Sequence, residues 1–502
     1  MKKFVVILNL LLVVAGVRAA LPEPDLLARV HFAGAQKIST APNAAVFTNQ
    51  FCSVEAVTLR AQTADKLSVW LALWLQKNVG STVPDGAAKL RPLFDDLQSA
   101  EWFLESRVAA GGQPQVAIAI KLDASRAQLW QTSLKPFFPA ATFKVSGGWL
   151  IFISSPDAQT LGDALAGEIM RADNAWLALD VNWPRLAQWY PKLKELGLPE
   201  TRFTLTAPDA NLHIDGKFFF PENLALNLEP WQMPTNTMHQ PFISFTAVRG
   251  FAAWLKSQVW AQPYQISPVP NQLFVWALPQ MPFQTFAAVP VPDAADALAQ
   301  AGARLKPVVE STNRQNAFLM PVSLAMTNNE INFSGVPFVS PYLQTVKGAA
   351  GQFLLAGGFP NTPRGKSLPP ELFTRMAERN LLLYHWEITA ERLPQVLSLS
   401  QLGLLITAHR QLDANSAAFK WVQKIGPTLG NTVTEITQTG PAEMSFARKA
   451  TGGFTAVELY ALANWLEASN FPHCDLRLPL RAKNLKHPHP APMPVPAPAA
   501  SK

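Results

Sequence analysis

Cysteine is scarce in this sequence: Cys52 and Cys474 are the only two in 502 residues. So few cysteines exclude a disulfide-rich scaffold, and the fold must therefore depend on its apolar core. In an oxidising compartment the two suggest one disulfide, which would join the start of the fold to its end. The alternative is two unrelated buried thiols. The sequence leaves both open, because it does not show whether the two Cα atoms come within bonding distance.

Long apolar runs are absent after the first twenty residues, so no later stretch approaches the length of a membrane-spanning helix. The start of the chain has the layout of a signal peptide, with basic Lys2 and Lys3, apolar Phe4–Val14 and a cleavage site after Ala19. The alternative is an uncleaved membrane anchor. A lipid-anchored lipoprotein would have a cysteine directly after the cleavage site, and this sequence has none there. We expect an exported protein, periplasmic or extracellular, with no transmembrane span after cleavage.

A dominant charge of one sign is also missing from the body of the chain. The formal net charge is +7, but residues 1–19 hold three basic residues and no acid, and residues 481–502 hold four and no acid. Residues 20–480 are therefore close to neutral. A nucleic-acid-binding domain needs a concentrated basic face, so nucleic acid is excluded as an expected partner.

Common catalytic and metal-binding motifs are absent. The sequence has no His-Glu-x-x-His and no Gly-x-Ser-x-Gly, and its histidines lack metal-ligand spacing. Carboxylate pairs such as Asp95/Asp96 and Glu101/Glu105 are expected on an exposed helix face, not on two walls of a cleft. We therefore predict no catalytic residue, no metal site and no cofactor.

Two partial motifs have simpler interpretations. Gly358–Ser367 ends like a phosphate-binding loop, but Pro360 stands where the first glycine is needed and two prolines remove N–H donors. His385 and Glu387 have the spacing of a zinc deaminase motif without its cysteines. We interpret the first as a surface loop and the second as part of a half-buried strand with both side chains on one face.

What the chain does contain is a recurring order of segments. A short apolar run is followed by a residue that can cap a helix and then by an arginine, which predicts a buried strand leading into a helix. The four copies are Val116–Ile120 with Asp123 and Arg126, Trp176–Leu179 with Asn182 and Arg185, Phe242–Phe245 with Thr246 and Arg249, and Leu381–Tyr384 with Thr389 and Arg392. Strand pairs with turn signals such as Gly147-Gly148 follow. We therefore predict an α+β fold of duplicated β-α-β-β modules, with antiparallel sheets and helices packed on one face.

Further elements come from apolar periodicity. Leu26–Phe32 and Ser53–Arg60 are predicted strands, and Thr63–Lys77 and Pro84–Arg107 are predicted amphipathic helices. Thr455–Ala468 is predicted to be a closing helix. The domain prediction is a signal peptide at 1–19, an N-terminal α+β domain at 20–225, a C-terminal α+β domain at 240–480, and a disordered Pro/Ala-rich basic tail at 481–502.

The recurring arginines are the candidate ligand residues. Arg126, Arg185, Arg249 and Arg392 would converge on an anionic ligand if the modules shared an axis. The alternative is descent from one ancestral unit. The fifteen tryptophans also have two interpretations, as core residues or as platforms for a sugar or an apolar ligand.

The signal peptide, the recurring units and the closing helix at Phe454–Glu467 together resemble an uncharacterised group of exported bacterial proteins, a domain of unknown function. The resemblance is in layout and implies no activity and no site residues. Three functions remain open: a non-enzymatic envelope protein that binds or assembles with an unknown envelope partner, a carrier of an apolar or lipid-like small molecule, and a hydrolase whose site is assembled from several modules.

Overall fold

A computed structural model describes residues 25–473 except 81, 110–111, 170–173, 195, 240, 259–260, 262–264, 281–283, 315–320, 337–338, 360–367, 369 and 409–412. The predicted signal peptide, the predicted tail and Cys474 lie outside the described residues. Among the residues that are described, none of the helices combines the length and the apolar character that crossing a membrane requires.

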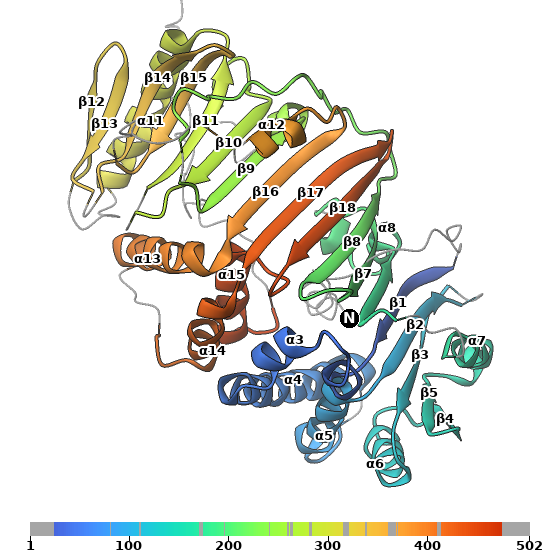
Figure 1. Cartoon of the computed structure of the whole chain (residues 1–502). Helices are drawn as coiled ribbons and strands as arrows, with labels where there is room; N and C mark the ends of the chain where they lie inside the picture. Colours follow the sequence, from blue (N-terminus) through green and yellow to red (C-terminus); the bar gives the residue numbers. More distant parts are fainter. Residues whose placement is uncertain are drawn as a thin grey trace, which may run out of the picture.

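The strands fall into two sets along the chain (Figure 1). The first set is β1 (Leu26–Phe32), β2 (Trp102–Val108), β3 (Pro114–Lys121), β4 (Thr142–Ser146), β5 (Trp149–Ile153), β6 (Leu177–Val181), β7 (Glu200–Thr206) and β8 (Leu212–Phe219). The second set is β9 (Ser244–Arg249), β10 (Gln272–Ala277), β11 (Thr285–Val291), β12 (Ser323–Met326), β13 (Glu330–Ser334), β14 (Tyr342–Gly348), β15 (Gly351–Gly357), β16 (Leu381–Ile388), β17 (Asn431–Gly440) and β18 (Glu443–Ala450).

The helices connect these strands. Those of the first set are α2 (Ala35–Ser39), α3 (Ala45–Phe51), α4 (Val54–Val79), α5 (Gly86–Ser99), α6 (Ala124–Leu134), α7 (Gln159–Ile169), α8 (Trp183–Leu186) and α9 (Pro191–Lys194). Those of the second set are α10 (Ala252–Ser257), α11 (Ala294–Arg314), α12 (Pro370–Met376), α13 (Thr389–Ala408), α14 (Ala417–Ile425) and α15 (Ala456–Glu467).

All described strands belong to one open antiparallel sheet of 18 strands. The pairings give the spatial order β4-β5-β3-β2-β1-β6-β7-β8-β18-β17-β16-β9-β10-β11-β15-β14-β13-β12. The prediction of an α+β fold with antiparallel pairing is confirmed.

The two halves of this sheet have the same connectivity. The pairings β1–β2, β1–β6, β2–β3, β3–β5, β4–β5, β6–β7 and β7–β8 recur as β9–β10, β9–β16, β10–β11, β11–β15, β14–β15, β16–β17 and β17–β18. Helices occur at matching points of the two halves: α6 of the first half corresponds to α11 of the second, and α7 corresponds to α12. The hairpin β12–β13 is an addition to the second half, where it pairs with β14.

The halves meet where equivalent strands pair, β8 with β18. Two ion pairs cross this joint: Lys217 of β8 lies 2.7 Å from Glu443, and Lys449 of β18 lies 2.6 Å from Asp209. Helices also cross it, because α4 of the first half packs against α14 and contacts α15 through the Gln62–Glu467 hydrogen bond. The sheet and the helix layer therefore both continue from one half into the other.

Helices cover both faces of the sheet, so the prediction that they pack on one face is wrong. Alternate residues of β3 show this, since Ile118 and Ile120 pack with α5 and α6 while Ala117 and Ala119 pack with α7. We call the sheet face that α5 and α6 cover the major helical face. Helices α8, α11, α13 and α15 also lie on it. Helix α12 lies on the other face, as α7 does.

Several predicted elements are confirmed. Strand β1 has the predicted bounds, and Gly147-Gly148 forms the two-residue turn of the β4–β5 hairpin with φ of 55° and 78°, values that favour glycine. Thr455 caps α15 in a reciprocal capping box with Glu458. Asp123 and Asn182 each accept a backbone N–H at 2.9 Å, from Arg126 and Arg185.

Three predicted elements differ from the structure. Ser53–Arg60 is not a strand but the start of α4, because the Ser53 hydroxyl accepts the Ala56 N–H and begins a 26-residue helix. The helix predicted over Pro84–Arg107 ends at Ser99, and its second part is strand β2. Thr246 does not cap a helix: it lies inside β9, and α10 begins only at Ala252.

Residues 226–239, between the two predicted domains, pack on the second half. Met233 and Met238 are 6% and 3% exposed in the core beneath α12, and Trp231 packs against the same cluster. The division into two domains stays a prediction, since one sheet runs through both.

Candidate functional site

The first two candidate arginines lie in the N-terminal half, each in a local network. The guanidinium of Arg126 donates to Asp96 at 2.7 Å and to the Pro92 carbonyl at 3.0 Å, which fixes α6 to α5. The hydrogen bonds that Arg126 donates to the Asp96 carboxylate raise the pKa of Arg126 above its ordinary value. Arg185 donates to the Leu26 carbonyl at 2.6 Å and so ties α8 to β1.

Arg249 is buried on β9 and is bound almost wholly by backbone. Its guanidinium donates to the carbonyls of Leu381, Glu229, Glu378 and Arg379 at 2.7–3.0 Å. It also lies 4.6 Å from the ring centroid of Trp231. Burial lowers the pKa of Arg249, although a guanidinium remains charged. These contacts join the segment between the halves to the start of β16.

Arg392 is buried on α13 at a different place. It donates to Thr285 Oγ1 at 2.9 Å and to Gln395 Oε1 at 2.7 Å. Thr285 pairs with Ala277 at one end of β10, whereas Arg249 pairs with Gln272 at the other end. The structure therefore does not bring the four arginines together, and each has separate protein partners.

The predicted disulfide involves one described residue. Cys52 is exposed at the end of α3, next to the start of α4. His473, the last described residue, lies with its ring 6.3 Å from that of Trp70, most of the way along α4. Cys474 lies outside the described residues, so the pairing stays a prediction.

His385 and Glu387 share one face of β16, as the sequence predicts. Thr246 Oγ1 lies 2.8 Å from His385 Nδ1, and His385 Nε2 lies 3.4 Å from Glu387 Oε2. Glu387 is 1% exposed and accepts from the Thr389 hydroxyl at 2.9 Å and from the Ala456 N–H at 2.7 Å.

Thr246, His385 and Glu387 thus form a chain of a hydroxyl, an imidazole and a carboxylate, the three groups that nucleophilic catalysis uses. Here the carboxylate is occupied by the first turn of α15, where an acid is favourable beside free N–H groups. Arg448 lies on the same face and bridges Thr434 to Glu458 of α15. Neither crevice described below is lined by these residues. We interpret the network as the attachment of α13 and α15 to the sheet.

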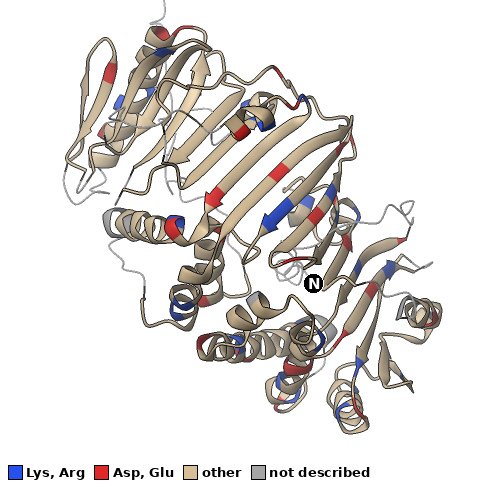
Figure 2. Ribbon diagram, viewed as in Figure 1, with Lys and Arg blue, Asp and Glu red and all other residues tan. Residues whose placement is uncertain are grey.

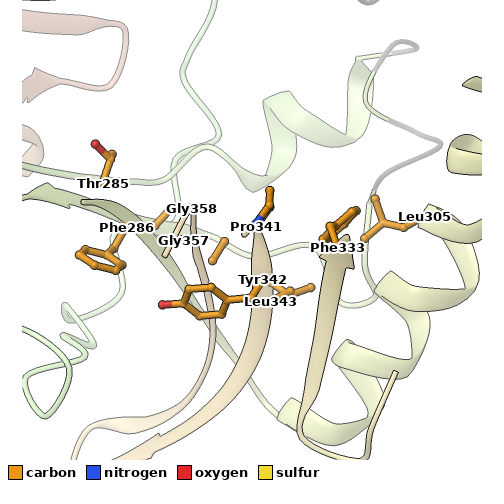
Figure 3. Close-up of a pocket in the computed structure, with 11 residues that line it drawn as sticks. Thr285, Phe286, Leu305, Phe333, Pro341, Tyr342, Leu343, Gly357 and Gly358 are labelled. Atoms are coloured by element: carbon orange, nitrogen blue, oxygen red, sulfur yellow. The ribbon is translucent and has the colours of Figure 1, made fainter. Parts of the chain in front are cut away.

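An apolar crevice of about 430 Å³ lies where β11, β14 and β15 begin or end, beside α11. Figure 3 shows Phe286 and Tyr342 on one side of it, Leu305 and Phe333 on the other, and Pro341 between them. Its other lining residues are Thr285, Ala287, Leu343, Ala356, Gly357 and Gly358. Apart from the Thr285 and Tyr342 hydroxyls, all its lining side chains are apolar, which suits an apolar ligand.

Gly357 contributes to the shape of this crevice. A Cβ at this position would lie 2.9 Å from both the Phe286 ring and the Tyr342 ring, closer than Cβ atoms approach other groups. Glycine therefore lets the two aromatic rings approach the strand from neighbouring positions in the register. The Thr285 hydroxyl is held by Arg392, so the floor of the crevice is fixed from the helix layer.

A second crevice, of about 330 Å³, lies beneath α12 on the opposite sheet face. Its lining is aromatic with one carboxylate: Pro241, Phe242, Phe245, Glu371, Leu372, Tyr384 and Trp386. Burial, with a contribution from Glu435, raises the pKa of Tyr384 above its ordinary value, so this phenol is neutral at physiological pH.

Charge is spread over the molecule. Figure 2 shows acidic and basic residues interspersed over helices and strands, with neither sign dominating the visible face. Within the described ranges, no group of three or more His, Cys, Asp or Glu side chains is placed to hold a metal ion.

Comparisons with protein-family models, with curated proteins and with solved structures find no match to this chain.

The sequence did not indicate either crevice. Strands β10, β14 and β15 were not predicted, so the residues that meet at Gly357 could not be placed together. Two features of the sequence could have predicted the β14–β15 hairpin. They are the alternating segment Tyr342–Val346 and the apolar run Phe353–Ala356, with Gly348 and Gly351 between them.

Proposed function

We propose that the protein is an exported, non-enzymatic binding protein that holds an apolar small molecule in the crevice beside α11. The observation that supports this most strongly is the lining of that crevice, in which aromatic and aliphatic side chains surround two hydroxyls. Its volume of about 430 Å³ is within the range of small-molecule sites. The signal-peptide layout of residues 1–19 supports export. The proposal includes an envelope partner, because a carrier must deliver its ligand to another molecule.

A carrier is favoured over a hydrolase by the position of the polar groups. The His385–Glu387 network is engaged with α13 and α15 and is separate from the apolar lining. A carrier needs apolar burial and few polar contacts, as this crevice provides.

The first test is native mass spectrometry of the mature protein purified from its own envelope fraction. We expect a retained small molecule that is absent from the denatured spectrum. Nile red, a neutral apolar dye, then tests the site: Leu305→Trp fills the crevice and should weaken dye binding at least tenfold, because burial of apolar area is the main source of affinity.

Leu73→Trp is the matched control. Leu73 is 61% exposed on α4 and lines neither crevice, so this variant should bind Nile red like the unmodified protein. Equal weakening in both variants, or none in Leu305→Trp, would show that the dye binds elsewhere and that the crevice is not the site.

A further inference from the structure

The crevice beneath α12 has a chemistry that differs from that of the apolar one. Strands β9 and β16 pair so that Phe245 lies beside Trp386 and Ala247 beside Tyr384, which puts the three aromatic side chains on one face. Phe242 closes the side, with its ring 6.4 Å from that of Phe245. Phe245 is 1% exposed and forms the floor, whereas Tyr384 and Trp386 are only half-buried and present ring surface to the crevice.

One carboxylate faces these rings. Glu371, in α12, lines the crevice, is exposed, and makes no hydrogen bond or ion pair with another described residue. The neighbouring Arg375 does not neutralise it, because that guanidinium is held by Glu435 and Glu378. No basic side chain is among the described residues that line the crevice.

The other half of the sheet shows that the fold does not require aromatic residues here. On the corresponding face of β1, β6 and β7, the in-register residues are Arg29, Asp180 and Arg202, which form ion pairs with their neighbours. In the second half, β9 and β16 carry Phe245 and Trp386 instead. The same framework thus holds an ion-pair ladder in one half and an aromatic crevice in the other.

We propose that this crevice binds an organic ammonium group, one with apolar substituents on a positively charged nitrogen. The negative faces of Trp386 and Tyr384 attract a cation at short range, and the Glu371 carboxylate supplies the opposite charge. Apolar substituents suit the Phe242 and Leu372 walls, whereas an anion would meet a carboxylate and, among the described lining residues, no basic group. A sugar would need more convergent hydrogen-bonding groups than this lining offers. Its polar side-chain groups are the Tyr384 hydroxyl, the Trp386 N–H and the Glu371 carboxylate.

The test uses three probes of one shape and three charges: choline, its neutral analogue 3,3-dimethylbutan-1-ol, and the anion 3,3-dimethylbutyrate. We measure binding to the full-length protein by calorimetry and by Trp fluorescence. Choline should bind at least tenfold more tightly than the alcohol, and the anion should not bind. Glu371→Gln keeps the size of the side chain and should weaken choline binding about fivefold, since it removes one exposed charge.

Glu391→Gln is the matched control, because Glu391 is an exposed acid of α13 on the major helical face and should not affect choline. Trp386→Leu should abolish choline binding, with the melting temperature measured to confirm folding. Equal affinity for choline and the alcohol, no effect of Glu371→Gln, or no choline binding at concentrations of order 10 mM would each overturn the proposal. Binding of a carbohydrate in this crevice, with no binding of choline, would also overturn the proposal. Leu305→Trp should leave choline binding unchanged, so this proposal and the apolar-ligand proposal fail or succeed separately.

Discussion

At the scale of single residues, four arginines each fix one element of the fold to another. Arg126 and Arg185 fix short helices to the N-terminal half. Arg249 and Arg392 are buried and satisfied by protein oxygens. The sequence around an arginine does not show which groups its guanidinium will contact. The carbonyls that bind Arg249, for example, come from segments 20 and about 130 residues away. The recurrence is compatible with descent from one ancestral unit.

Arg249→Met should destabilise the protein by about 3 kcal/mol, because one buried and three partly buried carbonyls lose their donor and the segment between the halves loses its attachment. Urea unfolding followed by circular dichroism measures this difference. Lys144→Met is the control: its ion pair with Asp163 is exposed on both sides, so the change should be below about 0.5 kcal/mol. Similar losses in both variants would contradict a special role for Arg249.

Glu458 shows how burial and charge compete at one carboxyl group. Burial alone would raise its pKa, but the charge and hydrogen bonds of Arg448 and the Thr455 N–H outweigh burial, so the pKa is lowered. A lowered carboxyl pKa means that the folded state favours the ionised form. Its contribution to stability is therefore present above the ordinary glutamate pKa of about 4.3 and is lost as the pH falls through the folded pKa.

Glu458→Gln should accordingly destabilise the protein at pH 7 by about 1–2 kcal/mol, a figure reduced from the buried-pair range because a third of the Glu458 side chain is exposed. The difference from the unmodified protein should shrink as the pH falls below the ordinary glutamate pKa. Urea unfolding at several pH values checks both statements, and Glu391→Gln should show neither effect. A pH-independent difference would mean that lost packing, not charge, is responsible.

At the scale of elements, the sequence predicted most where one pattern was clear. The apolar runs of β1, β3 and β16, the Gly147-Gly148 turn and the closing helix α15 all have local causes, and their positions are confirmed. Ser53–Arg60 alternates enough to suggest a strand, but a capping serine and continuity with the periodic residues that follow make it a helix. Glu101 and Glu105 were expected on an exposed helix face. Both are buried around β2, where Arg29 and Arg107 hold Glu105.

The missed elements have a common physical reason. Strands β10, β14 and β15 are short, and local patterning alone underdetermines them. The pairing of β11 with β15 joins segments more than 60 residues apart, so no local motif places Phe286 beside Gly357. Both candidate crevices depend on these or similar long-range pairings. The crevice residues are ordinary aromatic and aliphatic side chains, whose role follows from which strands bring them together, and this information is absent from any local motif.

At the scale of the whole molecule, the two halves repeat one connectivity and join through equivalent strands. Pairing of β8 with β18 leaves β4 and β12 as the outer strands of the sheet (Figure 1). The joint also involves the helix layer, since α4 contacts α14 and α15. We infer that an ancestral half was duplicated, and that one half then gained the β12–β13 hairpin and the crevices.

The position at which the chain can be divided follows from the packing of residues 226–239. Met233 and Met238 are buried with the second half, so a fragment that starts at residue 240 lacks core side chains, whereas one that starts at 222 keeps them. Pro221 and Glu222 are exposed. We expect fragments 20–221 and 222–480, when co-expressed, to associate through β8 and β18 into a soluble complex close to the full-length protein in melting temperature.

Fragments 20–221 and 240–480 should form a much less stable complex, or none. Each buried methionine that is removed costs about 2–5 kcal/mol, and the Arg249 contact with the Glu229 carbonyl is lost as well. Size-exclusion chromatography and thermal unfolding compare the two divisions, and the undivided chain is the reference. If both divisions gave complexes of equal stability, residues 226–239 would be a surface linker after all, and the division into domains at 225 and 240 would be the correct one.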